Sequence, residues 1–114
     1  MAAGVLDAET ERAARAFLAR LDGRYAVREA IVFGSRARGD FGPESDADLA
    51  VVLRGPKARR FPAVIDMAGT AFDILLETGI LVEALPLWEE EIDKPDDFSN
   101  PDLIWNIQSE GIKL

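Results

Sequence analysis

Two aspartates separated by one residue, Asp46 and Asp48, have the types and the spacing that metal binding needs. The apolar run that begins at this pair, Ala47–Leu53, predicts a β-strand. In an extended chain, residues two apart point to the same face. Both carboxylates could therefore converge on one metal cluster. Oxygen ligands favour hard cations such as Mg2+ or Mn2+, and two such ions can clamp the attacking and leaving oxygens of a nucleotidyl transfer.

A Gly-Ser pair, Gly34 and Ser35, offers the complementary half of such a site. Glycine lets the backbone approach a phosphate closely, and serine adds a hydroxyl and an amide. If a helical turn begins here, its N-terminal amides favour an anion. Arg36 and Arg38 add positive charge, and either could contact a triphosphate.

Each half also has an ordinary structural explanation. A Gly-Ser pair is usually just a turn, and an Asp-x-Asp pair is most often solvated surface or a helix cap. The combination is more specific, because a strand ends in Gly34-Ser35, ten residues follow, and Asp46-x-Asp48 opens the next apolar strand. This order favours one functional site over two unrelated surface features.

Hydrophobic periodicity predicts the elements that must position these residues. Apolar residues at spacings of three and four predict two helices, Asp7–Leu21 and Phe61–Thr78. Apolar runs predict three strands, at Val27–Phe33, Ala47–Leu53 and Ile80–Leu87, and Pro86 favours a sheet edge for the last. The other segments are predicted as a helical turn, three loops and a C-terminal helix: Arg36–Gly39, Asp40–Ser45, Arg54–Arg60, Trp88–Asn100 and Pro101–Gly111.

Two helices on one face of a small sheet place the chain in the α+β class, as an α/β sandwich. The length of 114 residues and the 48% hydrophobic content suit a single domain over residues 1–114. No repeat or domain boundary interrupts it. A chain this short has no room for a separate substrate-recognition domain, so a partner could supply part of the specificity.

Composition excludes several kinds of chemistry. The sequence has no cysteine and no histidine, which excludes disulfides, thiol catalysis, Cys/His zinc sites and Ser-His-Asp triads. The net charge of -8 disfavours general binding to nucleic acid, since that affinity comes from Lys and Arg neutralising phosphates. Met1–Asp7 lacks the pattern of a secretory leader, and no apolar run is long enough to span a bilayer. We therefore expect a cytoplasmic protein without a membrane segment.

The spacing of Gly34, Ser35, Asp46 and Asp48 resembles the signature of the DNA polymerase β-type nucleotidyltransferase superfamily. It is most similar to the minimal nucleotidyltransferase (MNT) domains of prokaryotic HEPN/MNT toxin–antitoxin pairs, whose signature is Gly-Ser, ten residues, then Asp-x-Asp. The flanking Arg36–Gly39 and Ser45–Leu49 are also typical of that branch, and the tail Asn106–Gly111 looks like the tail of some short members. The similarity covers most of the chain, and its specific part is residues 34–53.

This resemblance implies a mixed sheet with helices packed on it and transfer of a nucleoside monophosphate from a nucleoside triphosphate, with release of pyrophosphate. It implies that Asp46 and Asp48 bind two Mg2+ ions and that Gly34 and Ser35 hold the triphosphate. In toxin–antitoxin members the donor is ATP and the acceptor is a tyrosine hydroxyl of the HEPN ribonuclease toxin. Adenylylation then silences the toxin, so the resemblance implies an antitoxin with a HEPN partner.

Family members with full activity usually carry a third carboxylate, most often Asp, on a neighbouring strand. It helps to bind the catalytic metal and can accept the proton of the attacking hydroxyl. The best candidate is Glu83, which interrupts the apolar run Ile80–Leu87. The alternative is that its face is simply exposed near the sheet edge. Asp73 is the second candidate, but it would need Phe72–Leu76 to be a strand, against the helical periodicity.

Other features of the sequence have mainly structural interpretations. The acidic tract Glu89–Asp93 is expected to be a solvated face, with a basic partner as the alternative. Trp88, Phe98 and Trp105 are interpreted as satellite core, although an exposed aromatic cluster there could form an oligomer or toxin interface.

The sequence leaves two main functions open. One is a metal-dependent nucleotidyltransferase that acts as an antitoxin, and the other is a catalytically weak or inactive protein of the same fold that neutralises the toxin by binding. Nucleotide transfer to a small molecule such as an aminoglycoside is a third possibility, but it usually needs an additional helical domain.

Overall fold

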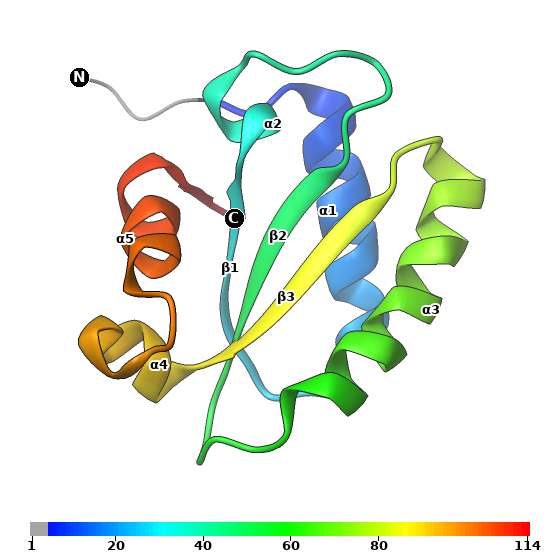
Figure 1. The fold of residues 1–114 in the computed structure, drawn as a ribbon. Helices are drawn as coiled ribbons and strands as arrows, with labels where there is room; N and C mark the ends of the chain where they lie inside the picture. Colours follow the sequence, from blue (N-terminus) through cyan, green and yellow to red (C-terminus); the bar gives the residue numbers. More distant parts are fainter. Residues whose placement is uncertain (1–4) are drawn as a thin grey trace.

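The computed structural model describes residues 5–114 (Figure 1). The first four residues, part of the stretch in which no leader pattern is found, lie outside the described residues. The chain forms, in order, α1 Ala8–Leu21, β1 Val27–Phe33, α2 Ser35–Arg38, β2 Ala47–Leu53, α3 Arg60–Thr78, β3 Val82–Trp88, α4 Glu89–Asp93, a 3-10 turn η1 Pro95–Asp97, α5 Pro101–Glu110 and β4 Ile112–Lys113. The predicted helices and the first two predicted strands are confirmed to within one residue at each end.

The four strands form one mixed sheet in the order β3-β2-β1-β4. β1 runs antiparallel to both β2 and β4, whereas β2 and β3 are parallel because α3 returns the chain between them. This architecture confirms the α+β class. It also confirms the edge position that Pro86 predicted, since β3 has a neighbour on one side only.

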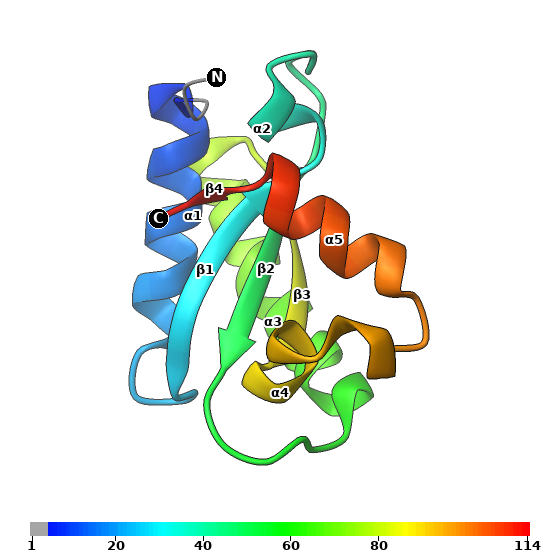
Figure 2. The same ribbon diagram turned by 90° about the vertical axis from the view of Figure 1, so that its left-hand side faces the viewer.

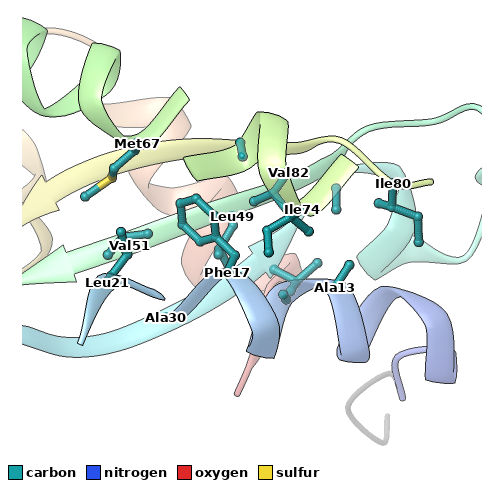
Figure 3. Close-up of a cluster of buried hydrophobic side chains, with 14 of the residues drawn as sticks. Ala13, Phe17, Leu21, Ala30, Leu49, Val51, Met67, Ile74, Ile80 and Val82 are labelled. Atoms are coloured by element: carbon teal, nitrogen blue, oxygen red, sulfur yellow. The ribbon is translucent and has the colours of Figure 1, made fainter. Parts of the chain in front are cut away.

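Alternation along the strands gives the sheet two apolar faces. One face packs against α1 and α3, which together form the larger core; ten of its residues are labelled in Figure 3. The other face packs against α4 and α5, on the opposite side of the sheet in both ribbon views (Figures 1 and 2). The prediction of two helices on one face is therefore confirmed but incomplete, because shorter helices cover the second face.

The N-terminal cap of α1 illustrates how local sequence sets an element's start. The carboxylate of Asp7 accepts a hydrogen bond from the Thr10 backbone N–H at 3.1 Å, which satisfies one of the free amides of the first turn. Thr10 itself is buried, and its hydroxyl donates to Asp7 at 2.6 Å. The same hydroxyl also takes part in the site described below.

The acidic segment after β3 is where the sequence prediction is wrong. Trp88–Asn100 was expected to be a loop with a solvated acidic face, but it forms α4 and η1, and Glu91 is only 5% exposed. Arg60, at the start of α3, donates to both carboxylate oxygens of Glu91 at 2.9 and 2.6 Å. The guanidinium also lies over the rings of Trp88 and Phe98 at 5.4 and 5.3 Å from their centroids. Pairing between residues so far apart in the sequence does not appear in the local hydrophobic periodicity, so the sequence did not predict it.

The charge state of Glu91 follows from its partners. Burial alone would raise the pKa of this carboxyl, but the hydrogen bonds from Arg60 and from the Trp88 backbone lower it below its ordinary value of 4.5. A lowered pKa means that the carboxylate stabilises the fold above pH 4.5, and that this contribution is lost as pH falls through the folded-state pKa.

We expect Glu91→Gln to lower the free energy of unfolding at pH 7 by about 2 to 4 kcal/mol, because Arg60 keeps its charge without a carboxylate partner. The difference from the unsubstituted protein should shrink as pH falls below 4.5, where Glu91 itself becomes protonated. Urea unfolding at several pH values measures both effects. Asp96→Asn, an exposed acid in the following turn, is the matched control. Equal destabilisation by the two variants would contradict the role given to Glu91.

Candidate active site

The predicted site residues lie at the end of the sheet where β1 finishes and where β2 and β3 begin (Figure 1). β1 ends at Phe33, the chain turns through Gly34 into the single turn of α2, and the loop 39–46 returns it to β2. The strand register fixes the rest: Asp48 pairs with Phe33 on one side and with Glu83 on the other.

Glu83 lies beside the acidic pair, as the third carboxylate was predicted to do. Residues paired across adjacent strands share a face and lie about 5 Å apart, so the side chains of Asp48 and Glu83 are neighbours. Burial, a hydrogen bond with the carboxyl of Asp46 and the charges of both aspartates raise the pKa of Glu83. The structure therefore brings Asp46, Asp48 and Glu83 together. Asp73 lies on α3, outside this group, which confirms the helical interpretation of its segment.

Gly34 allows the closest approach in the site. Its φ of 73° and ψ of -156° belong to a region that is essentially restricted to glycine. A Cβ at this position would collide with the Oδ2 atom of Asp48, so the carboxylate of Asp48 packs directly against the backbone of the turn. The sequence signature thus joins two residues that touch, although they are fourteen positions apart.

The three carboxylates suit a hard cation by their chemistry. Burial and then the charge of Asp46 raise the pKa of Asp48, and the positive charge of Arg38 opposes them. Negative charge thus accumulates at this point, as expected where a divalent ion binds. Within residues 5–114, however, no three acidic side chains already stand in a geometry that holds one metal ion.

Arg36 does not face the carboxylates, contrary to the prediction that it contacts a triphosphate. Its side chain is 4% exposed and lies over the Phe41 ring at 4.6 Å from the centroid. Its guanidinium donates to the Ser45 carbonyl at 2.9 Å, to the Thr10 hydroxyl at 2.8 Å and to the Pro43 carbonyl at 3.5 Å. Arg36 is thus a structural residue that ties the loop 39–46 to α1.

Arg38 is the arginine that remains available to an anionic ligand. It is exposed and lies near enough to Asp48 to lower the pKa of that carboxyl. Its guanidinium forms ion pairs with Asp40 at 3.3 Å and with Glu110, at the end of α5, at 3.5 Å. Exposed pairs of this kind are weak, so a triphosphate could displace them. The sequence did not indicate Glu110, since nothing local links it to α2.

A hollow between β1, α4 and α5 lies apart from the three carboxylates. Its charged lining residues are already paired, Arg28 with Asp93 at 3.2 Å and Lys113 with Glu29 at 3.2 Å. Charges that neutralise one another leave little to attract a triphosphate, so the candidate active site remains the carboxylate group beside Gly34.

Comparisons with known proteins agree with this geometry. Residues 12–113 match the family model described as "Nucleotidyltransferase domain". A protein of Methanocaldococcus jannaschii named "Putative protein adenylyltransferase MJ0604" is 33% identical over 91 residues, which cover 78% of this chain and 84% of that protein.

A solved structure from Sulfolobus solfataricus, titled as that of "a putative nucleotidyltransferase", superposes with a TM-score of 0.55. It is 21% identical and the match covers 92% of this chain and 81% of that one. At this identity the likeness concerns the fold. Within residues 5–114, no helix is both long enough and apolar enough to cross a membrane.

The different positions of the two arginines predict different effects on stability. Arg36→Met should lower the free energy of unfolding by about 2 to 4 kcal/mol, because it leaves buried acceptors in the loop and on α1 without their donor. Arg38→Met should leave the unfolding midpoint almost unchanged, since its side chain is in water. Urea unfolding of the two variants gives the comparison, and a reversed order would contradict the structure.

The contact between Gly34 and Asp48 can be separated from backbone strain. Gly34→Ala and Gly39→Ala both place a side chain at positive φ, but only the first adds an atom that meets a neighbour. We expect Gly34→Ala to be the more destabilising by about 1 to 3 kcal/mol. Thermal and urea unfolding measure the difference. If the two alanines cost the same, Asp48 does not pack against the turn as described.

Proposed function

Because the chain belongs to the nucleotidyltransferase domain family, we propose that it transfers AMP from ATP to a tyrosine hydroxyl of a HEPN ribonuclease toxin and so acts as an antitoxin. Nucleotidyl transfer is the activity of the family, and the chain is a nucleotidyltransferase. The donor, the acceptor, the metal and the biological role are the parts that we propose.

The observation that carries the proposal is the grouping of Asp46, Asp48 and Glu83 beside the Gly34-Ser35 turn. An acidic group alone would repel a triphosphate, so the proposal needs divalent cations, for which these carboxylates are the ligands. Mg2+ is the expected ion, two per site, and Mn2+ is a suitable substitute. When bound, such ions neutralise the charge of the reacting phosphates and polarise the transferred group.

We assign phosphate binding and proton acceptance to residues of the chain. The turn at Gly34 and Ser35 offers backbone amides and a hydroxyl to the β- and γ-phosphates, and the exposed Arg38 adds a positive charge near them. The acceptor oxygen attacks the α-phosphorus, the bond to the bridging oxygen of the β-phosphate breaks, and pyrophosphate leaves. Glu83, which lies beside Asp48 across the strand pair, accepts the proton of the attacking hydroxyl.

A protein acceptor is favoured by two observations. The relative from Methanocaldococcus jannaschii is named "Putative protein adenylyltransferase MJ0604", and the chain covers 84% of its length. Because the described elements build one sheet with its helices, the acceptor must bring its own docking surface to the open edge of the site. The tyrosine of a HEPN toxin follows from the resemblance of the Gly-Ser and Asp-x-Asp signature to MNT domains.

An antitoxin that binds without transferring is the second candidate. Glu83 stands where related enzymes usually have Asp, and its longer side chain changes where the carboxylate lies. This difference is compatible with a slow enzyme or with a protein that has kept only the fold.

The decisive experiment incubates the protein with the HEPN protein encoded beside its gene, ATP labelled at the α-phosphate and Mg2+. We expect label on the HEPN protein, and a loss of at least about 100-fold in Asp46→Asn combined with Asp48→Asn, since metal-binding carboxylates act on the transition state. Glu83→Gln should retain an intermediate rate. Label should disappear with a chelator and return with Mg2+ or Mn2+.

Asp73→Asn is the matched control, because it removes an exposed acid from α3 and should transfer at the normal rate. A tight complex that carries no label would instead support the antitoxin that acts by binding. Transfer that survives in the Asp46 and Asp48 double variant would remove the proposed site altogether.

A further inference from the structure

The outer face of α3 exposes a row of large apolar side chains. Phe61 is 70% exposed, Ile65 56%, Phe72 55% and Leu76 71%. At 100° per residue, these four positions and the small residues between them fall within about 100° of arc, so they form one stripe along the helix. The apolar stripe therefore comprises Phe61, Ile65, Ala68, Gly69, Phe72 and Leu76.

The stripe is not the core face of the helix. The buried residues of α3 lie on the opposite side, where they pack against the sheet and α1: Ala63, Met67, Thr70, Ala71 and Ile74. In both ribbon views α3 is an outer element of the molecule (Figures 1 and 2). A helix that is apolar on two opposite sides has a second surface to bury, because a helix exposed on one side is normally polar there.

The spacing within the stripe is symmetrical. The large residues stand four positions apart at each end, and Ala68 and Gly69 occupy the centre. In an antiparallel pair of α3 helices related by a two-fold axis between positions 68 and 69, Phe61 meets Leu76 of the second copy and Ile65 meets Phe72. The two small central residues allow the helices to approach closely where they cross.

The acid Asp66 beside the stripe is already paired with Arg24 of the same copy. A surface that repeats itself under a two-fold rotation fits a second copy of this chain better than an unrelated partner.

We propose that the stripe is the interface of a homodimer in which two α3 helices pack antiparallel across their centres. The four large side chains expose on the order of 500 Å2 of apolar surface per copy. Two copies would bury about 1,000 Å2, near the lower limit for specific interfaces, so the dimer is weak. The carboxylates project from the face of the sheet opposite α3 and remain open in the dimer.

Sedimentation velocity on the full chain tests for self-association. The protein concentration is varied from about 1 µM to about 1 mM, the range of weak association. We expect a monomer–dimer equilibrium that Phe72→Glu shifts at least tenfold toward monomer. Trp105→Glu is the matched control: Trp105 is 48% exposed but lies on α5, so its substitution should leave the equilibrium unchanged. A protein that stays monomeric throughout the range overturns the proposal, as does equal weakening by the two substitutions.

Cysteine cross-linking tests the register without depending on affinity, and the sequence contains no cysteine to interfere. In the antiparallel pair, two copies of Ala68→Cys are offset by one residue, about 1.5 Å along the axis, whereas two copies of Ile65→Cys are offset by seven, about 10 Å. Only the first lies within the range of about 7 Å between Cα atoms that a disulfide needs.

Mild oxidation should therefore yield a covalent dimer from Ala68→Cys and not from Ile65→Cys. Equal cross-linking of both variants would indicate a parallel pair, and no cross-linking of either would indicate that a different partner covers the stripe; each result overturns the proposal. Both substitutions replace exposed residues, so each variant should keep the unfolding midpoint of the unsubstituted chain within a few degrees.

Discussion

The buried guanidinium of Arg36 is the interaction on which the site depends. It lies between the loop that leads to β2 and the hydroxyl of Thr10 on α1, and it donates to the Ser45 and Pro43 carbonyls of that loop and to that hydroxyl. These bonds tie the loop 39–46, at whose end Asp46 stands, to α1. Arginine suits this role because its planar group offers several donors in fixed directions and stays charged. The sequence predicted that this side chain contacts a ligand, whereas its hydrogen bonds in the structure go to the protein itself.

The order and register of the strands position the other residues of the site. The crossover through α3 places β3 parallel to β2 and in register with it, so Glu83 arrives beside Asp48 although the two are far apart in sequence. On the other side Phe33 pairs with Asp48, which brings Gly34 against the carboxylate. The Arg60–Glu91 pair fixes the far end of the same β3 and anchors α3 and α4 to it. The two arginine networks thus secure the sheet at both ends, and the acidic group lies at only one of them.

What the sequence predicted, and what it missed, follows from the range of the interactions. The main helices and strands were predictable because their periodicity is local. The grouping of the Gly-Ser pair with the Asp-x-Asp pair was predictable because one ends a strand and the other begins the next strand. Glu83 could be selected because a charged residue in an apolar run is unusual. The burial of Glu91 depends on Arg60, thirty-one residues away, and the two-residue β4 is too short to show alternation. Arg36 and Arg38 look equivalent in the sequence, and only the packing of Phe41 and Thr10 distinguishes them.

The acidic group at the end of the sheet lowers the stability of the folded protein, and interactions elsewhere in the fold offset this effect. Burial and the neighbouring acids raise the pKa of Asp48 and of Glu83, so these two carboxyls are harder to ionise than isolated ones. The nearby positive charge of Arg38 lies in water, where it compensates weakly. A protein selected for stability alone would replace at least one of them. The sheet can carry this cost because the apolar packing of its two faces stabilises it independently of these carboxylates. A local conflict of this kind, within a chain whose other features agree with one another, is typical of a functional site.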